Sequence, residues 1–120
     1  MLIKIPGIDS QAVADLYNDD LEMYETILHS FVSRIPGVLD KIRNVSSETL
    51  PDYMIKIHAL KGSSGSVGAN ETMTAAARLE AMAKNGDLAG VLAGNAAFLE
   101  KADALVNDIK NWLEQSDVRN

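Results

Sequence analysis

The chain of 120 residues contains no cysteine. This absence excludes disulfide frameworks, thiol catalysis and cysteine-based zinc sites, and it agrees with a reducing compartment. Aromatic residues make up only 5% of the chain, so its core must be mainly aliphatic. An aliphatic core, together with abundant Ala, Leu, Met and Glu, favours helices over a β-sandwich.

The chain also lacks the marks of nucleic-acid-binding and membrane-spanning proteins. Its formal net charge is −6 and its pI is about 4.7, whereas nucleic-acid backbones are bound mainly through clustered Lys and Arg. Residues 1–6 are too short for the apolar stretch of a signal peptide, and no run approaches the roughly 18 apolar residues of a membrane span. We expect no nucleic-acid partner, no membrane contact and a cytoplasmic location.

Turn and capping residues divide the first part of the chain into two predicted helices. Asp9 or Ser10 could cap a short helix that runs to about Tyr17. In the second helix, Asp19 and Glu22 have the spacing of a capping box.

The second helix carries a long apolar stripe with alternating spacings of three and four. Its members are Leu21, Tyr24, Leu28, Phe31, Ile35, Val38 and Ile42. Seven positions on one stripe are a strong helical signal. Pro36 lies inside this stretch and is expected to kink the helix near Ser33, because its ring clashes with the preceding turn.

Three further helices are predicted beyond a polar loop at residues 44–48. Pro51 suits the first turn of the third helix, Asn70 could cap the fourth, and Asp87 could cap the fifth. The apolar stripe of the fifth helix has Asn95 as its only polar member. No apolar run of period two competes, so the pattern predicts an all-α, up-and-down helical bundle with antiparallel neighbours, formed as a single domain over residues 1–120.

One segment, Gly62–Gly68, does not fit easily. Three glycines in seven residues resemble a flexible linker and would cost a helix about 2–3 kcal/mol relative to alanine. Composition alone slightly favours a loop. However, Ser64 and Val67 continue the helical spacing of Ile57 and Leu60, so a helix that extends through the glycines stays open.

On a helix over residues 51–69, His58 has an unusual set of neighbours. At about 100° per residue, Lys61, Gly62 and Gly65 share its face, while Leu60 and Ser64 point inward with the other apolar positions. The histidine thus lies on the solvent side of a core helix. Bare backbone at the glycines gives access to its ring, and a lysine stands within reach of any group attached to it.

This arrangement suits phosphoryl transfer. A neutral imidazole is a competent nucleophile at physiological pH, and the oxygens of a phosphohistidine need a cation such as Lys61. Missing side chains at Gly62 and Gly65 would let a partner's active site close around His58. Because phosphoryl transfer depends largely on positioning and charge neutralisation, such access matters more than an elaborate pocket.

The residues around the histidine match a known motif. His58-Ala-Leu-Lys-Gly-Ser-Ser64 agrees residue for residue with the His-x-Leu-Lys-Gly-Ser-Ser/Ala motif of histidine phosphotransfer (HPt) domains. The sequence resembles the family over most of residues 5–90, including Ile5-Pro-Gly-Ile-Asp9, an opening found in hybrid sensor kinases. Further similar stretches are Tyr24 to Phe31, Val67-Gly-Ala69, Leu79-Glu80 and Asn85-Gly-Asp87.

The resemblance implies an antiparallel four-helix bundle with a short extra N-terminal helix. It implies that His58 accepts a phosphoryl group from a receiver-domain aspartate and donates it to another receiver, that Lys61 neutralises the phosphate, and that Gly62 permits approach. The magnesium would belong to the receiver, so no cofactor or metal is expected on this chain. A hybrid histidine kinase in cis is a further expected partner, and the family's domains are commonly monomeric.

The docking surface for a receiver is expected around this histidine. Met54 and Ile55 flank its face and suit either edge-of-core packing or a small apolar docking patch. Gly65 would leave room for the partner. Lys84 occupies a position where relatives often carry a basic or amide side chain near the site.

Two other readings of the chain remain. It could be a helical scaffold that binds receivers without being phosphorylated, or the phospho-accepting domain of a chemotaxis-type kinase. His29 matches no motif and is interpreted as a surface residue. The acidic cluster within residues 15–25 is better explained by helix caps and a solvated face than by a metal site.

Overall fold

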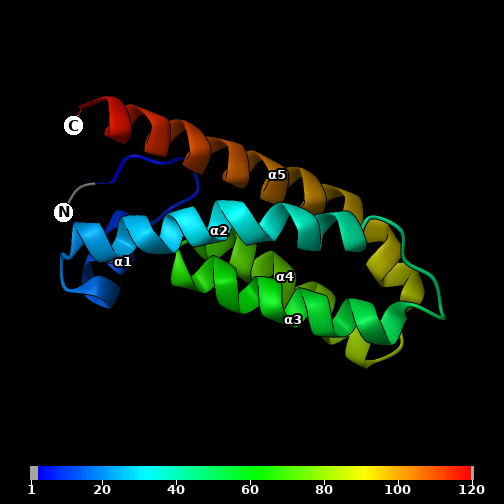
Figure 1. Ribbon diagram of the computed structural model, residues 1–120. Coiled ribbons are helices and arrows are strands. Elements are labelled where there is room, and N and C mark those ends of the chain that lie inside the picture. The colour runs from blue at the N-terminus through cyan, green and yellow to red at the C-terminus, as the bar shows by residue number, and fades with distance from the viewer. Residues whose placement is uncertain (1–2, 120) are drawn as a thin grey trace.

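The computed structural model describes residues 3–119, with side chains described as far as Ser116. Within that range the chain is helical and contains no strand (Figure 1), which confirms the predicted all-α class. The helices are α1 (Ser10–Tyr17), α2 (Leu21–Lys41), α3 (Leu50–Ser66), α4 (Asn70–Lys84) and α5 (Leu88–Arg119).

Helices α2 to α5 form the predicted four-helix bundle, with α1 as the short extra helix. Both α2 and α4 pack against α3 and α5, and α1 packs against α2. Short turns join α3 to α4 and α4 to α5, a longer loop over residues 42–49 joins α2 to α3, and successive helices of the bundle are antiparallel (Figure 1). Before α1, the segment with the buried Ile3 and Ile5 runs beside the C-terminal half of α5.

The bundle core is aliphatic, as the composition requires. On α3 the buried side chains are Tyr53, Ile57, Leu60 and Ser64, which leaves the intervening positions to face outward. The inward spacing of three and four residues therefore places His58 on the outer side of this helix.

The start of α2 corrects one prediction. Asp20, and not Asp19, caps this helix by accepting a hydrogen bond from the backbone N–H of Met23 at 3.0 Å. Asn18 and Asp19 instead adopt left-handed backbone conformations, with φ of 54° and 61°. These two residues turn the chain between α1 and α2, so the helix begins one residue later than a capping box with Asp19 requires.

The other caps are partly as predicted. Asp9 caps α1, and the Asp87 carboxylate accepts from the N–H of Gly90 in the first turn of α5. Asn70 is the first residue of α4 and does not cap it, because its side-chain amide donates to the Asp9 carboxylate at 3.4 Å. Pro36 lies within α2, which continues past it to Lys41.

The glycine-rich segment is helical as far as Ser66, so the loop that composition favoured is wrong there. Two tyrosines stabilise the end of α3. The Tyr17 hydroxyl donates to the carbonyl of Ser66 at 2.5 Å, and the buried Tyr24 hydroxyl donates to the carbonyl of Val67 at 2.7 Å. These tertiary contacts offset the low helix propensity of the glycines. The turn then uses Gly68 in a left-handed conformation, with φ of 81°.

The polar Asn95 of the α5 stripe connects three helices inside the bundle. Its side-chain oxygen accepts from the Tyr53 hydroxyl at 2.9 Å, and its amide nitrogen donates to the carbonyl of Ile42 at 2.7 Å. Burial and loss of hydration raise the pKa of Tyr53 to about 12, so its hydroxyl stays protonated as a donor. This cluster, which we call the Asn95 cluster, is buried and fully paired.

Candidate functional site

His58 lies on the exposed face of α3, and 66% of its side chain is accessible to solvent. Exposed residues precede and follow it on the same face of the helix. Ile55 lies one turn before it, with 65% of the residue exposed, and Gly62 lies one turn after it. The predicted outward histidine on a core helix is therefore present in the structure.

A buried carboxylate from α4 holds the inner side of the imidazole. Glu80 is only 5% exposed. Its Oε2 lies 2.5 Å from Nδ1 of His58, and its Oε1 accepts from Nζ of Lys61 at 2.6 Å. We call these three residues, His58, Lys61 and Glu80, the imidazole triad. The carboxylate has one oxygen for each of two donors.

The charge of Glu80 is stabilised by its partners. The hydrogen bond from Lys61 lowers the pKa of the Glu80 carboxyl below its ordinary value of 4.5; burial opposes this shift, and the hydrogen bond from His58 supports it. The carboxyl is therefore ionised at neutral pH. A buried carboxylate with two charge-assisted hydrogen bonds is a stable arrangement.

The ionised carboxylate also assigns the proton of the imidazole. A carboxylate is an acceptor only, so Nδ1 of His58 must be the donor in this contact. In the neutral ring the proton then sits on Nδ1, which leaves the lone pair on Nε2. The exposed ring thus offers Nε2 as its nucleophilic nitrogen, without any other base.

The two glycines that share the face of His58 are different in their surroundings. A Cβ atom built at Gly62 would meet nothing within 4 Å, so the backbone beside the imidazole is open. A Cβ atom at Gly65 would lie 2.9 Å from Sδ of Met73 on α4. The small size of Gly65 therefore accommodates the Met73 side chain, and a role of Gly65 in partner access stays a prediction.

The remaining residues of the predicted docking surface lie on α3 and α4, about one turn from members of the triad. Met54 is half-buried, next to the exposed Ile55. Lys84 is exposed and lies one turn beyond Glu80 on α4. No hydrogen bond or ion pair within residues 3–116 connects Lys84 to His58.

Sequence reasoning did not assign a role to Glu80. It entered only as part of the Leu79-Glu80 stretch that resembles the family. A signal was present, because Glu80 continues the inward positions Ala76 and Ala83 of α4 and is the only charged residue among them. A carboxylate at a core-facing helix position needs a partner, and the facing helix carries a histidine and a lysine.

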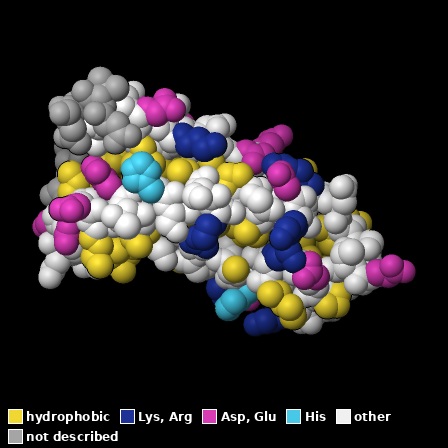
Figure 2. Space-filling view, viewed as in Figure 1, with side chains coloured by type: hydrophobic (Ala, Val, Ile, Leu, Met, Phe, Trp, Pro, Cys, Tyr) yellow, Lys and Arg dark blue, Asp and Glu magenta, His cyan; other side chains and the backbone are white. Residues whose placement is uncertain are grey.

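Among residues 3–116, the other ionisable groups form no second site of this kind. His29 is exposed on α2, as predicted. Acidic side chains gather at the end of the molecule formed by α1 and the start of α2 (Figure 2). Within the described part of the chain, no group of three or more His, Asp or Glu is arranged to hold a metal ion. None of the described helices is long and apolar enough to cross a membrane.

The fold and the site together define a class: a helical bundle that exposes one imidazole on a core helix, held from behind by a carboxylate. A comparison with protein families agrees, because the family model described as "Hpt domain" matches residues 26–112. The chain belongs to the Hpt domain family, whose members are phosphoryl carriers of phosphorelays and have no kinase activity of their own. No significant match was found among curated proteins or among solved structures.

Proposed function

We propose that His58 accepts a phosphoryl group from the aspartate of a receiver domain and passes it to a second receiver. The observation that carries this proposal is the contact between Nδ1 of His58 and the buried Glu80 carboxylate at 2.5 Å. It leaves Nε2 unprotonated on an imidazole that is otherwise open to solvent. The family match supports histidine phosphotransfer in general.

The step proceeds as a displacement at phosphorus. The lone pair of Nε2 forms a bond to the phosphorus of the aspartyl phosphate, and the bond from phosphorus to the aspartyl oxygen breaks, which releases the carboxylate of the receiver. The Nδ1 proton remains in its hydrogen bond to Glu80 throughout. Transfer to the next receiver is the reverse displacement, with Nε2 as the leaving group. The magnesium ion that this chemistry uses would be bound by the receiver.

Lys61 has a second task in this proposal. Before transfer its ammonium is paired with Glu80, and 33% of its side chain is exposed. An ammonium has three donors on a flexible stem, so Lys61 can turn part of its hydrogen bonding toward phosphoryl oxygens that arrive at Nε2. Glu80 would therefore keep the cation beside the imidazole until the phosphate arrives. Open backbone at Gly62 would give the receiver access.

A receiver would dock over the exposed face of α3 and the adjoining end of α4. Ile55 is the largest apolar side chain exposed beside the imidazole, with Met54 next to it and Lys84 at the rim. A small apolar patch with a charged rim is typical of transient protein interfaces. Gly65 would contribute to the shape of this face through the close packing of α3 on α4. We propose that the chain acts as a monomer, with receivers as partners and a hybrid histidine kinase in cis as a further partner.

The two alternatives differ from this proposal in what the imidazole does. A scaffold that binds receivers without phosphorylation has no use for a prepared Nε2, so the imidazole triad argues against it. The acceptor domain of a chemotaxis-type kinase would use the same triad, and only the phosphate donor differs. The measurement that separates them is therefore which class of protein, a receiver or a kinase, donates the phosphoryl group.

The experiment uses wild-type protein, His58→Gln and, as the matched control, His29→Gln, which removes the other exposed histidine. Each is incubated with a phosphorylated receiver, and acid-labile, base-stable phosphate is measured on the chain. We expect equal labelling of the wild type and His29→Gln, and none of His58→Gln. Label that survives in His58→Gln would refute the assignment. If a kinase domain labels the wild type and receivers do not, the chemotaxis-type alternative is correct.

A further inference from the structure

A groove runs between α4 and α5, away from the imidazole triad. It consists of two adjoining hollows of about 450 and 220 Å³ that share Ala75, Arg78 and Lys101. One end is polar, and the floor of the other is apolar. The residues of the apolar end are Leu79, Met82, Gly94, Ala97 and Phe98.

Small residues open this groove. Ala75 on α4 and Ala97 on α5 have side chains too short to fill the space between the helices. Gly94 allows α5 to approach α4 closely, because a Cβ atom there would lie 3.3 Å from Cδ2 of Leu79. The result is an apolar strip along the seam of two packed helices. Its accessible residues are Ala75, Met82 and Ala97, and the buried Leu79 and Phe98 form its floor.

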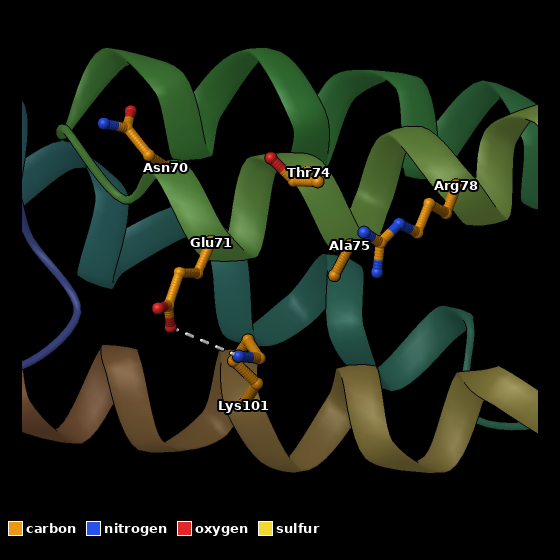
Figure 3. Close-up of a pocket in the computed structure, with 6 residues that line it drawn as sticks. All are labelled: Asn70, Glu71, Thr74, Ala75, Arg78 and Lys101. Atoms are coloured by element: carbon orange, nitrogen blue, oxygen red, sulfur yellow. Dashed lines mark ion pairs between the residues drawn. The ribbon is translucent and has the colours of Figure 1, made fainter.

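Two cationic side chains line the middle of the groove, where its two hollows adjoin. Arg78 reaches from α4 and Lys101 from α5 toward the gap between them (Figure 3). Lys101 makes a long, exposed ion pair with Glu71 at 3.5 Å. Arg78 forms no ion pair with any residue within the described range. On a chain with a net charge of −6, an unpaired arginine beside an apolar strip marks this groove as locally basic.

We propose that the α4–α5 groove binds an acidic amphipathic helix of a partner protein. An apolar stripe on that helix would cover the accessible Ala75, Met82 and Ala97. Carboxylates beside the stripe would pair with Arg78 and Lys101. Charge complementarity selects the acidic partner, because a basic segment would meet two like charges at the centre of the groove.

The dimensions of the groove favour a helix over a small ligand. The groove follows α4 from Glu71 to Met82, a span of roughly 17 Å, or about three helical turns. It is open along its length, whereas small-molecule sites enclose most of the ligand surface. A helix that lies in the seam of two others meets such a groove with side chains at spacings of three and four.

This groove and the phosphotransfer site lie on different sides of one helix. Glu80 faces α3, while Arg78, two residues earlier, is rotated by about 200° around α4 and faces the α5 side. A helix in the groove therefore leaves the imidazole face free. The proposal does not depend on phosphorylation of His58, and the two are tested separately.

The experiment is an NMR titration of the ¹⁵N-labelled full chain. The probe is a synthetic helical peptide of about 18 residues, with leucines at spacings of three and four and glutamates beside them. A second peptide has lysine in place of each glutamate. We expect the acidic peptide to shift the amide signals of Ala75, Gly94 and Ala97, and the basic peptide to bind at least about ten-fold more weakly.

The variants are Lys101→Glu and Lys110→Glu. They make the same change on the same helix, but Lys110 lies nine residues further along and faces the opposite side. Lys101→Glu should weaken binding of the acidic peptide about ten-fold and Lys110→Glu by less than about two-fold. Phosphotransfer to both variants should equal that of the wild type.

Three results would overturn the proposal. The acidic peptide could fail to bind at millimolar concentration, it could shift signals around Gly62 in place of Gly94, or the two lysine variants could weaken it equally. None of these results bears on the role of His58. Conversely, a chain that is never phosphorylated but binds the acidic peptide in the groove would keep this proposal and refute the proposed function.

Discussion

The imidazole triad and the Asn95 cluster are built from similar parts with opposite results. Each connects different helices through two hydrogen bonds to one central side chain, that of Glu80 or Asn95. In the Asn95 cluster every partner is buried, and Asn95 itself is 5% exposed. In the triad the central carboxylate is equally buried, but one of its partners, His58, is mostly exposed.

This difference shows how a buried polar group in a helical bundle can prepare an exposed side chain for a reaction. A closed cluster satisfies all of its members and contributes stability and register. An open cluster satisfies one nitrogen of a ring and leaves the other for a reaction. Substitutions in the Asn95 cluster should therefore change mainly the free energy of unfolding. Substitutions in the imidazole triad should change mainly the rate of phosphotransfer.

The largest effect on stability is expected from Asn95→Ala. Removal of the amide leaves the buried Tyr53 hydroxyl and the carbonyl of Ile42 without their partner, which should lower the free energy of unfolding by about 2–3 kcal/mol. Urea denaturation measures this, with Asn107→Ala, an exposed position on α5, as the control. Phosphotransfer to the folded variant should be unchanged. A slower rate at full folding would show that the two clusters are coupled.

Glu80→Gln should have the largest effect on rate after loss of His58 itself. A carboxylate offers two acceptors to two donors, whereas an amide offers one acceptor and one donor. If the amide nitrogen donates to Nδ1, the imidazole proton moves to Nε2 and blocks the nucleophile. We expect phosphorylation to slow about ten-fold or more, equivalent to about 1.4 kcal/mol in the barrier.

Imidazole ¹⁵N chemical shifts report the tautomer directly and provide a second readout for Glu80→Gln. The control is Glu100→Gln on the exposed face of α5, which should alter neither the rate nor the shifts. An unchanged tautomer together with an unchanged rate would show that Glu80 contributes packing alone.

A smaller effect separates the two glycines of the imidazole face. Gly62→Ala adds a Cβ into open space on a helix and should raise the free energy of unfolding by about 0.5–1 kcal/mol. Gly65→Ala should gain less, because the Sδ atom of Met73 has to move away from the new methyl group. Thermal or urea denaturation compares the pair. A larger side chain, Gly62→Leu, should slow transfer from a receiver, and an unchanged rate would remove Gly62 from the access path.

A pH dependence of stability is also expected from Glu80. Because the pKa of Glu80 is lowered in the folded state, its contribution is fully present above the ordinary carboxyl pKa and is lost as the pH falls through the folded value. Near neutral pH, the free energy of unfolding of the wild type should exceed that of Glu80→Gln by about 1 kcal/mol. This difference should shrink below about pH 4.5. A difference that stays constant down to about pH 3 would contradict an ionised Glu80.

The helical stripes were readable from the sequence because each combines many residues. The seven apolar positions of α2 and the long stripe of α5 specify their helices even with Pro36 inside one and Asn95 inside the other. The placement of His58 on an outer face follows from the same periodicity. A single cap is a weaker signal, and the chain offered Asp19 and Asp20 side by side at the start of α2.

Tertiary contacts explain what the sequence could not reveal. The helical state of the glycine-rich segment depends on hydroxyl groups from Tyr17 and Tyr24, which are more than forty residues away. The role of Glu80 depends on the register of α4 against α3, which a single sequence does not state. The same register places Sδ of Met73 close to where a Cβ atom at position 65 would lie.

The two tyrosine hydroxyls also bear on where the chain can be shortened at its N-terminal end. The family match begins at residue 26, after both Tyr17 and Tyr24. A fragment cut at that boundary would keep the histidine motif but lose both groups that satisfy the last carbonyls of α3. The glycine-rich turns following His58 would then have to hold their helical form without these two hydrogen bonds. A fragment that keeps both hydroxyl groups must therefore include Tyr17 in α1, which lies outside the segment that the family model matches.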